Sequence, residues 1–85
     1  WTNNIVGSEE HLIPPDYPAT PEGQRGFINA IKTITHEMDK ALGFCYWGAE
    51  LVAWNGDQST DGSPWENQAL FDFSNTALPV LSEFQ

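Results

Sequence analysis

The sequence has few of the groups that stabilise small proteins or bind nucleic acids. Cys45 is the only cysteine, so no disulfide can form within the chain, and there is no Cys/His cluster spaced for zinc. Three basic residues against twelve acidic ones give a net charge of −9, which would repel a phosphate backbone and argues against nucleic-acid binding. No apolar run approaches the roughly 20 residues that span a bilayer, and the N-terminus is too polar for a signal peptide.

The sequence is, however, rich in apolar and aromatic residues. Hydrophobic residues make up 40% of it, including four Trp and five Phe, which is typical of a globular core and not of a disordered chain. A chain of 85 residues buries only about 60–65% of the surface that its unfolded form exposes, and its stability would be marginal. Because disulfides and metals are also missing, we expect residues 1–85 to form no complete independent domain.

The clearest predicted element is a helix over residues 21–42. Thr20 is a good N-cap and Pro21 suits the first helical position, while Gly43 is a typical C-terminal signal. Apolar residues recur at helical spacing and predict one buried stripe, made of Phe27, Ile28, Ile31, Ile34, Met38, Ala41 and Leu42. The opposite face is polar and is expected to face solvent, with Asn29, Lys32, His36 and Asp39 on it.

The run Phe44-Cys45-Tyr46-Trp47 follows directly and predicts a short strand buried on both faces, as in a parallel sheet. The sequence offers no partner strands for it. We interpret Cys45 as a packing residue of this strand and not as a nucleophile, which would need exposure and a histidine base.

Turn-forming residues dominate from Gly48 to Pro64, and residues 69–73 could form a short extended piece. Residues 74–76 are expected to form a turn, and residues 77–84 a terminal helix with Pro79 in its first turn. The predicted order of loop, helix, buried strand, long loop and short helix is that of the closing part of an α/β fold built from repeated β/α units.

Three segments of the chain have the character of family motifs. They are Tyr17-Pro18-Ala19-Thr20-Pro21-Glu22-Gly23-Gln24, Gly43-Phe44-Cys45-Tyr46-Trp47, and Trp65-Glu66-Asn67-Gln68-Ala69-Leu70-Phe71-Asp72-Phe73 followed by Ala77-Leu78-Pro79. Together they resemble glycoside hydrolase family 53, the arabinogalactan endo-β-1,4-galactanases. The resemblance covers nearly the whole chain and implies the C-terminal third of a (β/α)8 TIM barrel. Residues 1–85 would supply the loop after strand 7, helix 7, strand 8, a long loop and helix 8 of one catalytic barrel.

The resemblance also implies an activity. Family members hydrolyse β-1,4-galactan, in the type I arabinogalactan of pectin side chains, by a retaining mechanism with two glutamates roughly 5–5.5 Å apart. Those glutamates lie at the ends of strands 4 and 7, outside this sequence, so no catalytic residue is assigned and the chain alone is expected to be inactive. The expected partners are a galactan oligosaccharide and the remainder of the barrel, and the expected location is secreted, periplasmic or on the cell surface.

Trp47 is the first candidate for substrate binding. In related barrel hydrolases a Trp at the end of strand 8 forms an apolar floor under the sugar, and an indole packs well on the C–H face of a sugar ring. The alternative for Trp47 is ordinary core packing. Tyr46 alternates to the opposite side of the strand and is expected to pack against helix 7 or helix 8.

Three further residues are weaker candidates for substrate binding. Glu50 follows the strand closely and could hydrogen-bond a sugar hydroxyl, although an insertion makes its alignment with the family's Tyr-Trp-Glu motif uncertain and a solvated loop carboxylate is the alternative. Trp54 and Trp1 lie in predicted loops, where large aromatic side chains need cover from protein or from ligand.

No cofactor is predicted. Asp57 and Asp61, with Ser59 and Ser63 nearby, offer oxygen ligands of the kind that calcium prefers. Their spacing is not that of an EF-hand, so we interpret them as a polar turn and leave calcium as an open alternative.

Two other classes of function remain open. The chain could be a small non-catalytic carbohydrate-binding module with exposed Trp side chains as sugar platforms, although such modules are usually β-sandwiches and the strongest element here is a helix. It could also be a structural or interaction domain with no sugar ligand, in which case Trp47 would not contribute to galactan affinity.

Overall fold

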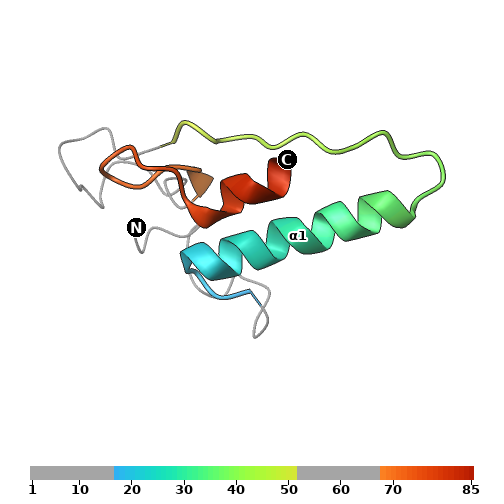
Figure 1. Cartoon of the computed structure of the whole chain (residues 1–85), viewed down its shortest axis with the longest axis horizontal. Helices are drawn as coiled ribbons and strands as arrows, with labels where there is room; N and C mark the ends of the chain where they lie inside the picture. The colour runs from blue at the N-terminus through green and yellow to red at the C-terminus, as the bar shows by residue number, and fades with distance from the viewer. Residues whose placement is uncertain (1–16, 52–67) are drawn as a thin grey trace.

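The computed structural model describes residues 17–51 and 68–85, which contain one α-helix and one 3₁₀-helix. The α-helix, α1, spans Pro21–Glu37, and the 3₁₀-helix, η3, spans Pro79–Phe84. Figure 1 shows η3 lying along α1, with the chain that follows α1 running back on the other side of η3. The last turns of α1 extend past the C-terminus of the chain.

The predicted start of α1 is confirmed. The Thr20 hydroxyl oxygen accepts a hydrogen bond from the Gly23 N–H at 3.0 Å, and Pro21 is the first helical residue. This bond satisfies one of the N–H groups that have no partner within the helix. Glu22 in the first turn places a negative charge where the helix dipole favours it.

The predicted end of α1 is wrong, because the helix ends at Glu37 and not at residue 42. Met38 has extended backbone angles, and its N–H bonds the Thr35 carbonyl. The side chains that would continue the apolar stripe are exposed, Met38 by 58% and Leu42 completely. Because packing supplies most of the stability of a protein helix, an apolar stripe that packs on no described segment does not extend α1.

The strand predicted at 44–47 is not formed. Among residues 17–51 and 68–85 the structure contains no strand, and no backbone group of 44–47 pairs with another backbone group. The side chains alternate: Phe44 and Tyr46 are partly buried against the core, whereas Cys45 and Trp47 are exposed. A strand needs a hydrogen-bonded neighbour, and without one the segment is extended but only half-buried. The interpretation of Cys45 as a packing residue is therefore also wrong here.

The end of the chain folds back on itself through a tight turn. Phe71 and Ala77 form an isolated antiparallel bridge, which is all that forms of the extended piece expected at 69–73. The Asp72 carboxylate accepts hydrogen bonds from the Ser74 and Thr76 N–H groups at 2.8 and 2.9 Å. The predicted turn at 74–76 is thus confirmed, since an Asp side chain readily closes such a turn.

The predicted terminal helix is present in a tighter form. It is a 3₁₀-helix that begins at Pro79, two residues later than predicted. Its Val80 side chain is fully buried, and the described core combines it with Ile28 of α1 and with Leu70 and Leu78 beside the turn. In the part of the chain described, no helix has the length and apolar character required to cross a membrane.

Candidate functional site

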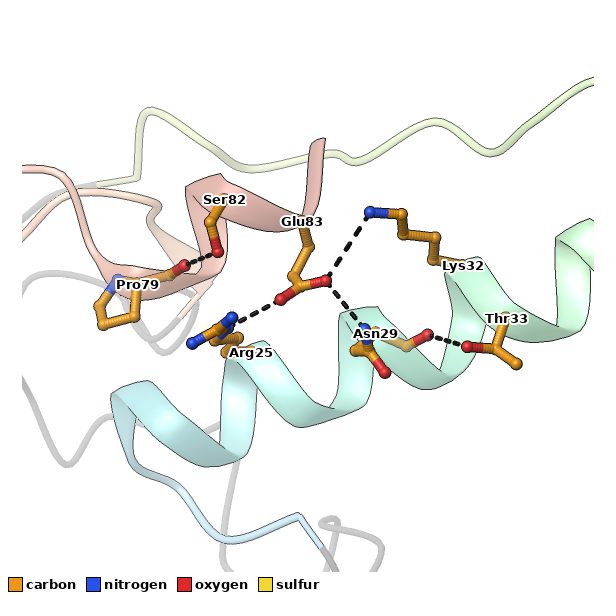
Figure 2. Close-up of polar contacts among 7 residues, drawn as sticks. All are labelled: Arg25, Asn29, Lys32, Thr33, Pro79, Ser82 and Glu83. Carbon is orange, nitrogen blue, oxygen red and sulfur yellow. Dashed lines mark hydrogen bonds and ion pairs between the residues drawn. The ribbon is translucent and has the colours of Figure 1, made fainter. Parts of the chain in front are cut away.

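A buried carboxylate joins α1 to η3. Glu83 accepts hydrogen bonds from Arg25 Nε at 2.7 Å and from Asn29 Nδ2 at 2.9 Å, and Lys32 Nζ lies 3.8 Å from it (Figure 2). Arg25, Asn29 and Lys32 lie on successive turns of α1, on the same face of the helix. The hydrogen bond from Asn29, and after it the one from Arg25, are the largest causes that lower the pKa of Glu83. The polar face of α1 therefore contacts η3 and is not simply solvated as predicted, and Glu83 has a structural part in the fold.

The Trp47 side chain is 82% exposed at the end of the extended segment. Its neighbour Tyr46 points the opposite way, and the Tyr46 ring packs edge-on against Phe84 of η3 with centroids 5.7 Å apart. The predicted packing of Tyr46 against the terminal helix is confirmed. Trp47 is not packed into the described core, so the structure offers its indole to a ligand or to further protein.

Polar contacts hold the Tyr46 side chain in place. Its hydroxyl donates to the Gln68 carbonyl at 2.6 Å and accepts from Gln24 Nε2 at 3.4 Å. Gln24 Nε2 also donates to the Ala69 carbonyl at 3.0 Å. Burial raises the pKa of Tyr46, and the hydrogen bond from Gln24 opposes this in part. The phenol is thus a neutral donor, and α1, residue 46 and residues 68–69 meet at one point.

The backbone just after Trp47 is also constrained. Gly48 has a φ of +100°, and a Cβ atom there would lie 2.8 Å from Gln68 Oε1 and 3.0 Å from Leu51 Cδ1. The Leu70 N–H donates to the Ala49 carbonyl at 3.0 Å. A side chain at position 48 would be strained, so glycine is required for this close approach of the two segments.

Of the other predicted substrate-binding residues, Glu50 alone lies among the residues that the structure describes. Glu50 is exposed in the turn after Gly48. Trp1 and Trp54 lie outside the described residues, as do the calcium candidates Asp57, Ser59, Asp61 and Ser63. His36 is exposed, as expected from its place on the polar face of the predicted helix. Within the described ranges, no three His, Cys, Asp or Glu side chains are grouped as a metal site would require.

Sequence reasoning missed Gln24, Gly48 and Glu83 as residues with specific contacts. Gln24 belongs to a segment that carries the family resemblance, and Gly48 directly follows Trp47, so both stood in recognisable places. Nothing in the sequence pairs Gln24 and Gly48 with residues 68–69, or Glu83 with Arg25 and Asn29 of α1. Their partners lie between 20 and 58 residues away.

Comparison with known proteins assigns the chain to a class and then to a family. The matching family model is one of glycosyl hydrolases, described as glycosyl hydrolase family 53, and it covers residues 1–84. The chain belongs to glycosyl hydrolase family 53. It is also 33% identical over 79 residues to a protein of Niallia circulans named "Uncharacterized protein in bgaB 5'region", an alignment that covers 88% of this chain. No solved structure matches the chain.

Membership of the family implies a TIM-barrel fold. A TIM barrel is built from eight strands and eight helices, whereas residues 17–51 and 68–85 contain α1, η3 and no strand. The chain spans 21% of the length of the Niallia circulans relative.

Proposed function

We propose that this chain is part of the catalytic barrel of an arabinogalactan endo-β-1,4-galactanase, which cuts β-1,4-galactan within the type I arabinogalactan of pectin. The proposal rests on the family match over residues 1–84, combined with the exposed Trp47 at the end of the segment that resembles strand 8. Because this substrate is an extracellular polysaccharide, the protein is expected to be secreted, periplasmic or on the cell surface.

In this proposal α1 is helix 7 of the barrel, residues 44–47 are strand 8 and η3 is helix 8. Two features support the assignment. The backbone groups of 44–47 have no backbone partner within the described residues, which leaves them open to neighbouring strands. Several large apolar side chains of α1 and the segment after it are exposed and could be covered by the remainder of the barrel: Phe27, Ile34, Met38 and Leu42.

The proposed role of Trp47 is to form the apolar floor of a sugar subsite. The C–H face of a galactose ring packs on an indole, while its hydroxyl groups need polar partners, and the exposed Glu50 carboxylate is the proposed nearby acceptor. Trp54 and Trp1 are proposed as further platforms. The nucleophile and the acid/base are two glutamates elsewhere in the barrel, so the 85-residue chain alone is expected to be inactive.

The test is hydrolysis of purified β-1,4-galactan by the full-length gene product. We expect galacto-oligosaccharides as products, with the β anomer appearing first in NMR spectra, because a retaining mechanism preserves the configuration. Trp47→Ala should lower kcat/KM about 10- to 100-fold, the effect of losing a large apolar contact, and Trp47→Phe should lower it less. Absence of galactan cleavage, or a Trp47→Ala variant as active as the parent, would refute the proposal.

A non-catalytic carbohydrate-binding module would use the same Trp side chains. Such modules are usually β-sandwiches, whereas the described residues form α1, η3 and one isolated bridge. A far-UV circular dichroism spectrum of the 85-residue chain dominated by β-structure, together with retained galactan binding, would favour the module over the enzyme.

A further inference from the structure

We propose that Gln24, Tyr46 and Gly48 are positioning residues for Trp47. They fix the backbone on both sides of Trp47, so that its exposed indole is held in place before a sugar ring arrives. This inference rests on the proposed function of Trp47 as a sugar platform.

The first anchor lies just before Trp47. The Tyr46 hydroxyl reaches the Gln68 carbonyl at 2.6 Å, and the Tyr46 ring rests on Phe84. Gln24 Nε2 lies within 3.5 Å of three oxygen atoms, which are the Tyr46 hydroxyl and the carbonyls of Gln68 and Ala69. One amide of α1 thereby ties the extended segment to the 68–69 backbone.

The second anchor lies just after Trp47. The positive φ of Gly48 turns the chain, and the Ala49 carbonyl then accepts the Leu70 N–H at 3.0 Å. Residues 46 and 49 are thus attached to consecutive parts of the same partner segment. Between the two attachments, the Trp47 side chain is 82% exposed, and no aromatic ring among the described residues stacks on it.

The two anchors give the exposed indole a fixed base. An unsupported loop would have to be ordered when a ligand binds, and that ordering reduces affinity, whereas a pre-ordered contact avoids the loss. The backbone of 44–47 makes no backbone hydrogen bond within the described residues, so the Tyr46 hydroxyl is its principal polar attachment there. The position of Trp47 therefore depends on a side chain that faces away from the ligand.

The test uses Tyr46→Phe in the full-length gene product, because this variant keeps the ring on Phe84 and removes only the hydroxyl. We expect KM for β-1,4-galactan to rise about three- to tenfold, the effect of losing one hydrogen bond, with a smaller change in kcat. Tyr17→Phe is the matched control: it also removes one hydroxyl, but from a ring that packs edge-on against Phe27. Tyr17→Phe should leave both KM and kcat unchanged.

A double-mutant cycle separates positioning from general structural damage. In a Trp47→Ala background, Tyr46→Phe should cause no further rise in KM, because the platform that it positions is already gone. Gly48→Ala, which perturbs the second anchor, should behave in the same way. An equal KM effect of Tyr46→Phe with and without Trp47, or no effect in the parent, would overturn this inference while leaving the role of Trp47 intact. If Trp47→Ala itself leaves KM and kcat unchanged, the proposed function fails.

Discussion

Two glycines of α1 should respond in opposite directions to the same substitution. Gly23 and Gly26 both lie within Pro21–Glu37, and alanine is intrinsically the better helix former by about 1 kcal/mol. Helix propensity alone would therefore predict that both Gly→Ala variants gain stability. The surroundings of the two positions differ in the structure.

At Gly26 an added Cβ atom would lie 3.7 Å from the Tyr17 ring, which is an ordinary contact distance. We therefore expect Gly26→Ala to raise the free energy of unfolding by about 1 kcal/mol. At Gly23 the Cβ atom would clash with the Pro18 carbonyl oxygen, which is a backbone atom and cannot rotate away. The same carbonyl accepts the Thr20 N–H at 2.8 Å, so its displacement also disturbs the N-cap of α1.

The cost of Gly23→Ala has two parts. Overpacking at a tight site costs about 1–3 kcal/mol, and a lost N-cap costs about 1 kcal/mol. After the gain in helix propensity of about 1 kcal/mol, Gly23→Ala should lower the free energy of unfolding by about 1–3 kcal/mol. Urea unfolding of the full-length gene product, followed by circular dichroism, measures both variants. Equal shifts of the unfolding midpoint for Gly23→Ala and Gly26→Ala would refute the reasoning.

Three other outcomes follow from the contacts described above. The pKa of Glu83 is held below its ordinary value of 4.5. The stability that the Glu83 carboxylate gives to the fold is therefore complete above pH 4.5 and is lost as the pH falls through the lower folded-state pKa. Glu83→Gln should reduce stability at neutral pH and should remove this part of the acid dependence when urea midpoints are measured against pH. Val80→Ala should lower the free energy of unfolding by about 1.5–3 kcal/mol, because it removes two buried carbon atoms and leaves a cavity; an unchanged urea midpoint would contradict the burial of Val80. Ile34→Ala should cost about 2–5 kcal/mol in the full-length gene product if the barrel covers this face, and a loss below about 0.5 kcal/mol, typical of surface positions, would show that the face is solvated.

The elements that depend on nearby residues were predictable from the sequence. The start of α1 rests on Thr20 and Pro21, and the turn at 74–76 rests on the Asp72 side chain, so each signal and its partner lie within four residues. The placement of Tyr46 and Trp47 on opposite sides of the chain followed from alternation along an extended segment.

The elements that depend on distant partners were not predictable in the same way. The apolar pattern that suggested a helix to residue 42 records which side chains can be buried, and not what buries them. The 44–47 run likewise has the composition of a strand but lacks a paired neighbour among the described residues. The bonds from Gln24 to Tyr46 and from Arg25 to Glu83 join residues 22 and 58 positions apart, and no local rule connects such pairs.

The most direct test of the account is a crystal structure of the full-length gene product with a bound β-1,4-galacto-oligosaccharide. The account predicts that residues 44–47 form a strand of a closed barrel and that a galactose ring lies on the indole of Trp47. A structure in which residues 44–47 belong to no sheet, or in which the sugar binds away from Trp47, would contradict it.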